Sequence, residues 1–208
     1  MPKVTEIKQN VKNKNKVSVF ADGEFLCSVT AESVVKMHIK VGDEIDNKKL
    51  ADTLFQSDCQ IAFSKAVDNV CKSIKTKSQV QKYLFDKGFS AEVVQNTISK
   101  MQEYRYVDDG EYVKSYVRTY QQSKGKKRIV FELKQKGVEQ EYINLVDDLI
   151  DDQKEYALAI AQKFAKGKEM DLKNVQKLYR HLATKGFDFE TCRFCANYIA
   201  NGVEHYDD

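Results

Sequence analysis

The sequence predicts a mainly α protein in which three tandem three-helix repeats form an elongated curved solenoid, preceded by a small N-terminal segment that contains a β-hairpin. Two observations predict this class. The stretch Ile129–Val138 has related copies at Val80–Phe89 and Leu178–Phe187, and a fixed period of this kind marks stacked supersecondary units. The only proline is Pro2 and glycine is sparse, so few helix breakers interrupt the chain after its first residues.

Each copy of the repeated stretch is expected to end a helix. The glycines Gly88, Gly137 and Gly186 follow one another at intervals of 49 residues. Glycine is preferred where a helix closes with left-handed backbone, and an apolar residue often follows it to seal the turn. The three repeats are therefore expected to share one geometry at this helix end.

The N-terminal segment is expected to contain three strands. Val4–Val11, Val17–Ala21 and Phe25–Val29 have the apolar and β-branched residues that strands favour. Lys12–Lys16 is expected to be a polar turn. The dipeptide Asp22-Gly23 is a strong short-range signal for a hairpin.

Two helices are expected to follow these strands. A helix at Ala31–His38, with Thr30 as its N-cap, would cover the apolar face of the sheet. Ile39–Ile45 is expected to be a turn or a short extended piece. Asp46 is expected to cap a further helix that continues through Phe55.

Beyond this segment, apolar residues recur at helical spacing and predict three helices in each of three repeats. The expected domains are 1–58 for the N-terminal segment and 59–107, 108–152 and 153–208 for the repeats. The apolar positions include Phe63, Ile74, Val80, Tyr112, Tyr116, Tyr120, Ile129, Leu149, Phe164, Leu178, Phe189 and Ile199. In the third repeat, Lys166–Asp171 is expected to be a loop. Units of about 50 residues are at the lower limit of a stable core, so the repeats are expected to stack.

The bulk composition is typical of a globular protein of the cytoplasm. Apolar residues make up 42% and charged residues 31% of the chain, proportions at which disorder is not expected. The N-terminus lacks the apolar stretch of a signal peptide, and no run approaches the ~20 apolar residues of a membrane span. The five cysteines are an odd number and are expected to be reduced thiols.

No motif of a common catalytic or cofactor-binding site is found in the sequence. No two of the nine glycines lie within ten residues of one another, so the Walker A loop and the dinucleotide fingerprint are absent. His38, His181 and His205 have no acid or thiol partner at a recognised ligand spacing. We therefore expect no enzymatic activity, no metal and no cofactor.

Cys192 and Cys195 have the Cys-x-x-Cys spacing of zinc and redox sites. A structural zinc site needs a second pair of ligands, and a thioredoxin-type site needs a βαβ context; this helical region offers neither. Together with Phe189 and Ile199, the two thiols form an apolar stripe at helical spacing. They are expected to pack in a helical core rather than to bind metal.

Charge is arranged in blocks around the middle repeat. Bases dominate residues 114–136, where Glu132 is the single acid, and residues 139–152 contain acids and no base. The run Lys124–Arg128 would surround a helix N-terminus, where the macrodipole is already positive. Because local helix physics disfavours cations there, the run is a candidate for binding phosphate or an acidic protein surface, and a solvated loop is the alternative. The candidate bases of this repeat are Arg118, Lys124, Lys126, Lys127, Arg128, Lys134 and Lys136.

Bases recur at the matching helix of the other two repeats. They are Lys77 and Lys82 in the first repeat, and Lys173, Lys177 and Arg180 in the third. Repetition of the same charge at the same element favours a continuous basic groove. Such a groove would bind an anionic partner.

Three tyrosines lie on one face of one predicted helix: Tyr112, Tyr116 and Tyr120. They are expected to be core residues whose hydroxyls reach the surface. The alternative is that Tyr112 and Tyr116 contact a partner, because tyrosine is enriched at protein interfaces.

Taken together, these motifs resemble the RecX family of bacterial regulatory proteins, which modulate the RecA recombinase. The resemblance rests on an acidic pair, an aromatic helix, a Gly-basic turn and a Glu-Leu helix that closes on glycine. In this sequence they are Asp108-Asp109, Tyr112–Arg118, Gly125–Arg128 and Glu132–Val138. The repeats cover residues 59 to about 200, and the N-terminal segment resembles the extension of members from Gram-positive lineages. The third repeat departs from the pattern, with His181 where the second has Glu132.

The resemblance implies a negative modulator of RecA. Proteins of this family bind RecA filaments on single-stranded DNA, lodge in the filament groove and limit filament growth, ATP hydrolysis and strand exchange, with roles in DNA repair, recombination and the SOS response. We expect a monomer in the cytoplasm that makes no membrane contact. Two alternatives stay open: direct binding of nucleic acid by the helical repeats, and a scaffold for another helical partner.

Overall fold

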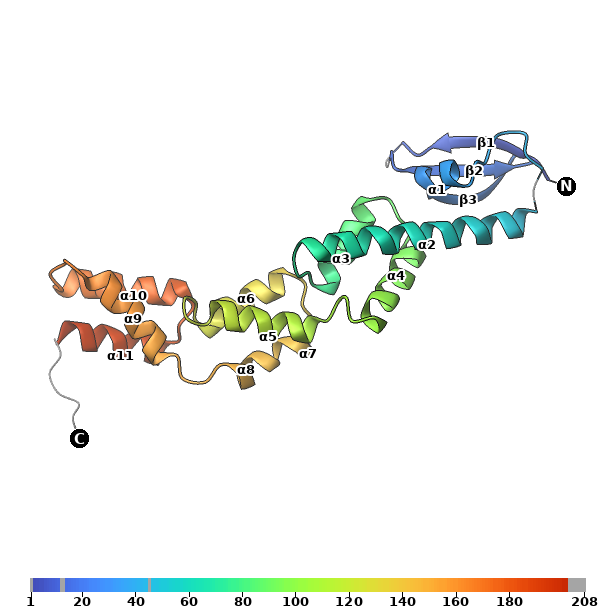
Figure 1. Ribbon diagram of the computed structural model, residues 1–208. Coiled ribbons are helices and arrows are strands. Elements are labelled where there is room, and N and C mark those ends of the chain that lie inside the picture. The colour runs from blue at the N-terminus through green and yellow to red at the C-terminus, as the bar shows by residue number, and fades with distance from the viewer. Residues whose placement is uncertain (1, 12–13, 45, 202–208) are drawn as a thin grey trace. The chain divides into compact units, whose positions relative to one another are not determined.

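The computed structural model describes residues 2–11, 14–44 and 46–201, and Figure 1 labels its helices and strands. Four residues on which expectations rest lie outside these ranges: Lys12, Asn13, Ile45 and His205. The chain divides into two compact units, Met1–Asp108 (unit 1) and Asp109–Asp208 (unit 2). Both are mainly helical, and unit 1 also carries a three-stranded sheet. The predicted fold class, helical repeats after a β-containing segment, is confirmed.

The N-terminal sheet is antiparallel, with the strand order β1-β2-β3. Its strands are β1 (Val4–Gln9), β2 (Lys16–Ala21) and β3 (Glu24–Thr30), and β1 ends earlier than expected. Asp22 and Gly23, between β2 and β3, have positive φ angles of 50° and 85°, as the tightest hairpin turns require. The hairpin predicted from this dipeptide is confirmed.

A buried carboxylate ties the sheet to the helices of unit 1. Asp58 accepts hydrogen bonds from the backbone N–H of Thr30 at 3.2 Å, from the Thr30 hydroxyl at 2.6 Å and from the Ser33 hydroxyl. Thr30 Oγ1 also accepts the N–H of Ser33 and so caps α1 (Ala31–Lys36), as predicted. Since Asp58 belongs to α2 (Asn47–Lys72), this cap joins β3, α1 and α2.

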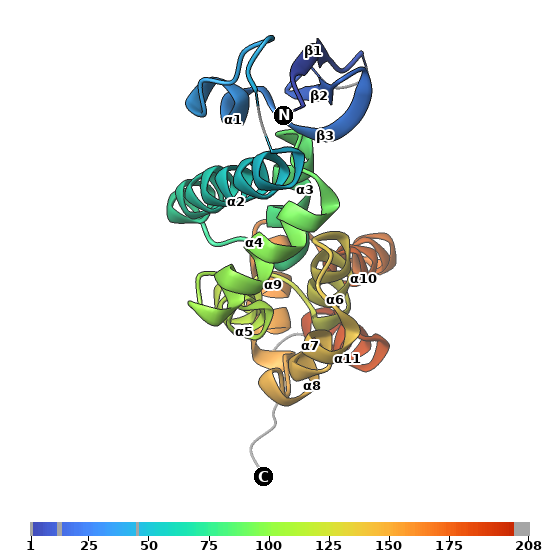
Figure 2. The ribbon, with the colours of Figure 1, turned by 90° about the vertical axis from the view of Figure 1, so that its right-hand side faces the viewer.

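Helix α2 is continuous and contributes to two cores. Asp46 precedes it and accepts the N–H of Lys48 at 3.0 Å, as expected for a cap. Leu54 is fully buried in the core of the sheet, whereas Ala62 and Ala66 are fully buried in the core of the following helices. Figures 1 and 2 show the sheet and α1 on one side of α2. The expected division after residue 58 falls inside this helix, because no glycine or proline interrupts it.

Helices α3 (Lys77–Asp86) and α4 (Ala91–Glu103) complete the first repeat. Thr76 caps α3 through a reciprocal capping box with Gln79. The prediction that Ile74 belongs to the apolar stripe is wrong. Its side chain is 65% exposed, because α2 has already ended and the chain turns before α3 begins.

The second repeat opens unit 2. It contains α5 (Asp109–Tyr120), α6 (Lys126–Gln135), α7 (Gln140–Ile143) and α8 (Leu145–Leu149). Where one third helix was expected, the structure has two short helices that meet at Asn144. Their buried residues close the same core as those of α5 and α6.

The third repeat contains α9 (Lys154–Ala165), α10 (Leu172–Lys185) and α11 (Phe189–Ala200). The loop predicted at Lys166–Asp171 separates α9 from α10. Aspartates cap both α10 and α11 by accepting an N–H group of the first turn.

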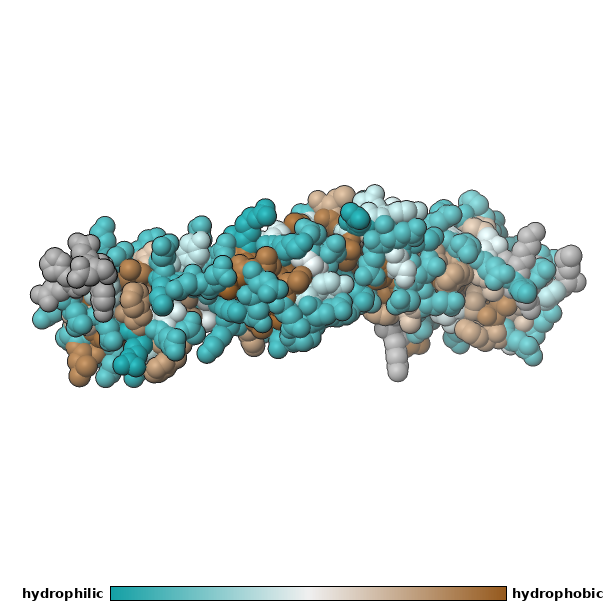
Figure 3. All heavy atoms as spheres, turned by 90° about the horizontal axis from the view of Figure 1, so that it is seen from below, coloured by the Kyte–Doolittle hydropathy of each residue, from teal (hydrophilic) through white to brown (hydrophobic). Residues whose placement is uncertain are grey.

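The third repeat confirms one prediction about its apolar stripe and corrects another. Cys192 and Cys195 are fully buried in the core of α9, α10 and α11, as expected, and burial raises the pKa of the Cys195 thiol to about 11. Phe189 and, in the second repeat, Leu149 were expected in apolar stripes but are 62% and 37% exposed. Each lies at an end of its helix, where neighbouring helices cover it only in part. On the face seen in Figure 3, exposed apolar residues are dispersed among hydrophilic ones.

The three repeated glycines end α3, α6 and α10 with the same geometry. Gly88, Gly137 and Gly186 have φ angles of 95°, 75° and 91°. In each case the N–H of the next residue donates to the carbonyl of the residue four positions before the glycine, at 3.2, 3.2 and 3.3 Å. That next residue is apolar and buried in all three copies. The predicted shared helix end is confirmed, and its bonding is that of a Schellman motif.

Two glycines let the second and third repeats meet backbone to backbone. A Cβ added to Gly125, the N-cap of α6, would overlap the carbonyl carbon of Gly186, and one added to Gly186 would overlap Arg128. The N–H of Gly125 donates to the carbonyl of Lys185 at 2.9 Å, and the N–H of Lys127 donates to that of Gly186 at 3.1 Å. The positive end of α6 thus receives carbonyl oxygens from the negative end of α10.

Gln153 completes this junction. Its Oε1 accepts the N–H of Lys126 at 2.8 Å, and its Nε2 donates to the carbonyls of Gln121 and Lys124, both at 3.2 Å. Gly125 has no side chain with which to cap α6. The third repeat supplies the missing acceptors, so the N-terminus of α6 is capped by hydrogen bonds to another repeat rather than by a side chain of its own N-cap residue.

Gly125→Ala is expected to lower the free energy of unfolding by about 2 to 4 kcal/mol, because the added methyl group would force the ends of α6 and α10 apart and break their backbone hydrogen bonds. Gly125 has an ordinary φ of −73°, so backbone strain adds nothing. Urea unfolding followed by circular dichroism measures the loss.

Gly167→Ala is the matched control for this change. Gly167 has a positive φ of 74° but open space where a Cβ would lie, so only the strain of about 1 kcal/mol is expected. A loss at Gly125 no larger than at Gly167 would contradict the close contact.

Candidate functional site

The basic run predicted as a candidate site spans the connection from α5 to α6 and the first turn of α6. Three of its four cations form ion pairs. Lys124 Nζ lies 2.5 Å from Glu132 Oε2, and Arg128 Nε lies 2.8 Å from Glu132 Oε1. Lys126 Nζ lies 2.8 Å from Asp147 Oδ1, in the acidic block that follows. The run is therefore partly neutralised within unit 2.

Glu132 is the centre of these contacts. Its side chain is 14% exposed, and its Oε2 also accepts the Tyr116 hydroxyl at 2.5 Å. Burial alone would raise the pKa of Glu132, but hydrogen bonds from Lys124, Tyr116 and Arg128 hold it at about 2. Burial and the bond to Glu132 raise the pKa of Tyr116, so its hydroxyl stays a donor. The network therefore keeps one charge state at neutral pH.

The three tyrosines of α5 form a ladder beside this network. The ring centroids of Tyr112 and Tyr116 are 6.0 Å apart, and those of Tyr116 and Tyr120 are 4.5 Å apart. Tyr112 is buried in the core, whereas the other two are half-buried, in line with the expectation of core residues whose hydroxyls reach outward. Lys124 Nζ lies 3.9 Å from the Tyr120 centroid, and Lys136 Nζ lies 5.6 Å from that of Tyr116. The rings are thus flanked by cations.

The remaining candidate bases of the second repeat reach the surface. Lys127 and Lys134 on α6 and Arg118 on α5 are exposed. Within the described residues, the side chains of these three form no ion pair or hydrogen bond. They are the cations of this repeat that are available to a partner without breaking a contact of the fold.

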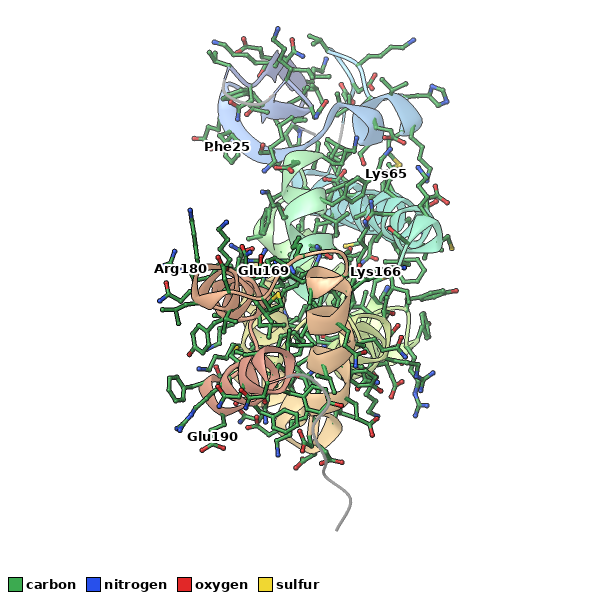
Figure 4. The ribbon with its side chains drawn as sticks, turned by 90° about the vertical axis from the view of Figure 1, so that its left-hand side faces the viewer. Phe25, Lys65, Lys166, Glu169, Arg180 and Glu190 are labelled. Carbon is green, nitrogen blue, oxygen red and sulfur yellow. The ribbon has the colours of Figure 1, made fainter. Side chains whose placement is uncertain are left out.

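The candidate bases of the other repeats fall into different units. Lys173, Lys177 and Arg180 lie on α10 in unit 2 and are exposed, and Figure 4 shows Arg180 at the outer side of its helix. Lys77 and Lys82 lie on α3 in unit 1. Unit 2 therefore contains the candidate bases of the second and third repeats. A groove that continues through all three repeats stays a prediction.

A cleft of about 290 Å³ lies between α6 and the end of α10. Its lining residues are Lys124, Arg128, Glu132, His181, Thr184 and Lys185. His181, Thr184 and Lys185 were not predicted as site residues from the sequence. A signal was present, because a lysine precedes each of the three repeated glycines. These lysines can be assigned to a site only when α10 is known to pack against α6, and no local sequence pattern shows that packing.

None of the helices within residues 2–11, 14–44 and 46–201 has the length and apolarity needed to cross a membrane. In the same residues, no group of three or more His, Cys, Asp or Glu side chains is arranged to hold a metal ion. All five cysteines are free thiols.

Three family models match the chain. The model described as Regulatory protein RecX N-terminal domain matches residues 2–46. The models described as RecX, second three-helix domain, and RecX, third three-helix domain, match residues 108–146 and 151–195. The matches follow the order of the observed segments: the sheet with α1, then the two repeats of unit 2.

Relatives with known names are similar over most or all of the chain. Regulatory protein RecX of Clostridium botulinum (strain Alaska E43 / Type E3) is 32% identical over 214 residues, which cover 100% of both chains. Regulatory protein RecX of Bacillus licheniformis is 31% identical over 196 residues, which cover 91% of this chain and 74% of the relative.

Two crystal structures share the fold. One of regulatory protein RecX aligns with a TM-score of 0.66 at 24% identity, over 95% of this chain and 100% of the other. One of RecX from Lactobacillus salivarius aligns with a TM-score of 0.65 at 23% identity, over 71% of this chain and 99% of the other.

Glu132→Gln is expected to lower the free energy of unfolding by about 1 to 2 kcal/mol at neutral pH, because Lys124, Arg128 and Tyr116 lose their shared carboxylate. The ordinary pKa of 4.5 is depressed to about 2 in the folded chain, so the stabilising effect is complete above 4.5. The difference from the wild type should shrink as the pH falls from 4.5 towards 2. Urea unfolding at a series of pH values measures it.

Glu111→Gln serves as the control, since Glu111 is an exposed acid paired with Lys114 at 2.8 Å. This variant should lose less than about 0.5 kcal/mol. Equal behaviour of the two variants at every pH would contradict the central role of Glu132.

Proposed function

Because the chain belongs to the RecX family of regulatory proteins, we propose that it is a negative modulator of the RecA recombinase. It binds RecA filaments on single-stranded DNA and limits their growth, their ATP hydrolysis and strand exchange. Family membership carries this proposal. The observed surface is compatible with it, since unit 2 presents bases that the fold does not use.

The bases of the second repeat divide into two groups. Lys126 and Arg128 form ion pairs with Asp147 and Glu132, so their charges are largely compensated within unit 2. Lys127 on the same helix is exposed, and its side chain has no ion pair or hydrogen bond to any described residue. Association through such exposed charges speeds the encounter with an oppositely charged surface and selects its orientation.

The proposal has consequences for location and assembly. RecA filaments form on DNA in the bacterial cytoplasm, so the chain would act there and without a membrane. A monomer suffices, because separate repeats of one chain can contact separate protomers of a filament. The role needs no catalysis by this chain.

Direct binding of nucleic acid is the second candidate function. The observation that favours it is the cleft between α6 and α10, in which three bases line the walls against one acid. Binding of this kind weakens as salt rises, because each phosphate contact releases counterions.

The double variant Lys127→Glu/Lys134→Glu is expected to raise the concentration needed for half-inhibition of RecA's DNA-dependent ATPase by about tenfold, because exposed attractive charges become repulsive. Its unfolding should match the wild type, since neither side chain pairs with a described residue. ATPase assays, with filament length measured by negative-stain microscopy, provide the test.

Lys100→Glu/Lys163→Glu is the matched control, with the same change of net charge at two exposed lysines outside the candidate set. Equal loss in both double variants would refute the assignment of Lys127 and Lys134. Wild-type protein in large excess that leaves the ATPase and the filament length unchanged would refute the function itself.

A further inference from the structure

An open groove of about 760 Å³ lies along the second half of α9, in unit 2. The rest of its lining comes from the connection after α5, the loop before α10 and the end of α11. Ala159 and Ala165 have short side chains, which leave the surface of α9 hollow between longer neighbours. None of the groove's residues is among the candidate bases of the three repeats. The groove is therefore a feature that the proposed function does not use.

The floor of the groove is apolar. Ile160, Met170 and Ile199 pack against the core of the third repeat, but each is only half-buried and also lines the groove. A ligand that covered these three side chains would remove apolar surface from water, which favours binding. Gln122 and Gln162 add amide groups that can both donate and accept hydrogen bonds. Such amides suit the N–H and C=O groups of a peptide backbone.

The charge of the groove is positive. Its charged side chains are Lys163 and Lys166, and no acid of the described residues lines it. Both lysines are exposed, and within residues 2–11, 14–44 and 46–201 their side chains form no ion pair or hydrogen bond. Figure 4 shows Lys166 on the α9 side of the loop that leads to α10. Because lysine stems lie along apolar surface while the ammonium groups reach water, the groove suits a ligand with both apolar groups and carboxylates.

The corresponding region of the second repeat is covered by polypeptide. The connection from α5 to α6 matches the loop from α9 to α10 in the third repeat. Gln153, which precedes α9, donates hydrogen bonds to the carbonyls of Gln121 and Lys124 in that connection. In the described part of the third repeat, the matching loop instead borders the open groove. A region that holds another protein segment in one repeat thus stays accessible in the next, which favours a protein ligand.

We propose that this groove docks a short acidic segment of a protein partner, with large apolar side chains on its floor and carboxylates beside Lys163 and Lys166. The α9 residues that line it extend over about 10 Å, the length of about three extended peptide residues. The phosphate backbone of a nucleic acid would leave the apolar floor uncovered. The inference goes beyond the proposed function: neither Lys127 nor Lys134 lines the groove, so this partner and the RecA filament would meet different surfaces.

Nuclear magnetic resonance of the isotope-labelled full chain, titrated with the hexapeptide Asp-Asp-Leu-Ile-Asp-Asp, tests the groove. This probe has the sequence of residues 147–152, which combines apolar and acidic side chains. Saturable shifts are expected for the amides of Ile160, Ala165 and Ile199. A peptide with serine in place of its leucine and isoleucine, and one with asparagine in place of its aspartates, should each bind at least about fivefold more weakly.

The double variant Lys163→Gln/Lys166→Gln is expected to weaken binding of the acidic hexapeptide by about three- to tenfold, because two exposed charge pairs are lost. Lys127→Gln/Lys134→Gln removes the same charge from α6 and is the matched control, which should bind the peptide as the wild type does. In the RecA ATPase assay, the Lys163→Gln/Lys166→Gln protein should inhibit as the wild type does. Circular-dichroism melts of both variants exclude unfolding as the cause of a loss.

Absence of saturable shifts at about 1 mM peptide, equal losses in the two double variants, or equal binding of the serine peptide would overturn the inference. The probe sequence also occurs in the chain, so sedimentation velocity tests a second copy as the occupant. A dimer that is lost in the Lys163→Gln/Lys166→Gln protein would assign the groove to self-association and overturn the partner. Loss of RecA inhibition in that variant would assign the groove to RecA, with the same consequence. Groove-dependent peptide binding by a protein without effect on RecA would support the groove and refute only the proposed function.

Discussion

The backbone contact between Gly125 and Gly186 is the constraint on which the surface of unit 2 depends. Neither position has room for a Cβ, so the N-terminus of α6 and the C-terminus of α10 approach until their backbones share hydrogen bonds. The unpaired N–H groups of one helix thereby receive the unpaired carbonyls of the other, and the two macrodipoles meet with opposite ends. This contact orients the basic turn and creates the cleft that contains Lys185.

The contact also explains how a run of cations persists at a helix N-terminus, a position that disfavours positive charge. Carbonyls from α10 and the side chain of Gln153 supply the acceptors that a local cap would otherwise provide. Glu132 and Asp147 then form ion pairs with three of the four cations and compensate their charge in part. The bases therefore divide into those that hold the fold and those, such as Lys127, that face solvent. Only the second group can be replaced without a cost in stability.

In unit 1, a single long helix joins the N-terminal sheet to the first repeat. One uninterrupted helix, α2, serves the core of the sheet at one end and the core of the first repeat at the other. The carboxylate of Asp58 on this helix holds both the backbone and the hydroxyl of Thr30, where β3 passes into α1. The N-terminal segment is thus built into the first repeat rather than attached by a linker.

The sequence by itself determined the features that depend on local backbone preference. The left-handed helix ends at the three repeated glycines, the Asp22-Gly23 hairpin and the Thr30 cap each follow from what a few adjacent residues can adopt. Helix ends were predicted less well: Ile74 and Phe189 match the apolar period but are mostly exposed, because neighbouring helices cover them at most in part. Only the tertiary structure decided which charges are free and where they gather. Glu132 meets Tyr116 across 16 residues of sequence, and Gln153 meets Lys126 across 27, so these partners are set by the docking of helices and not by spacing along the chain.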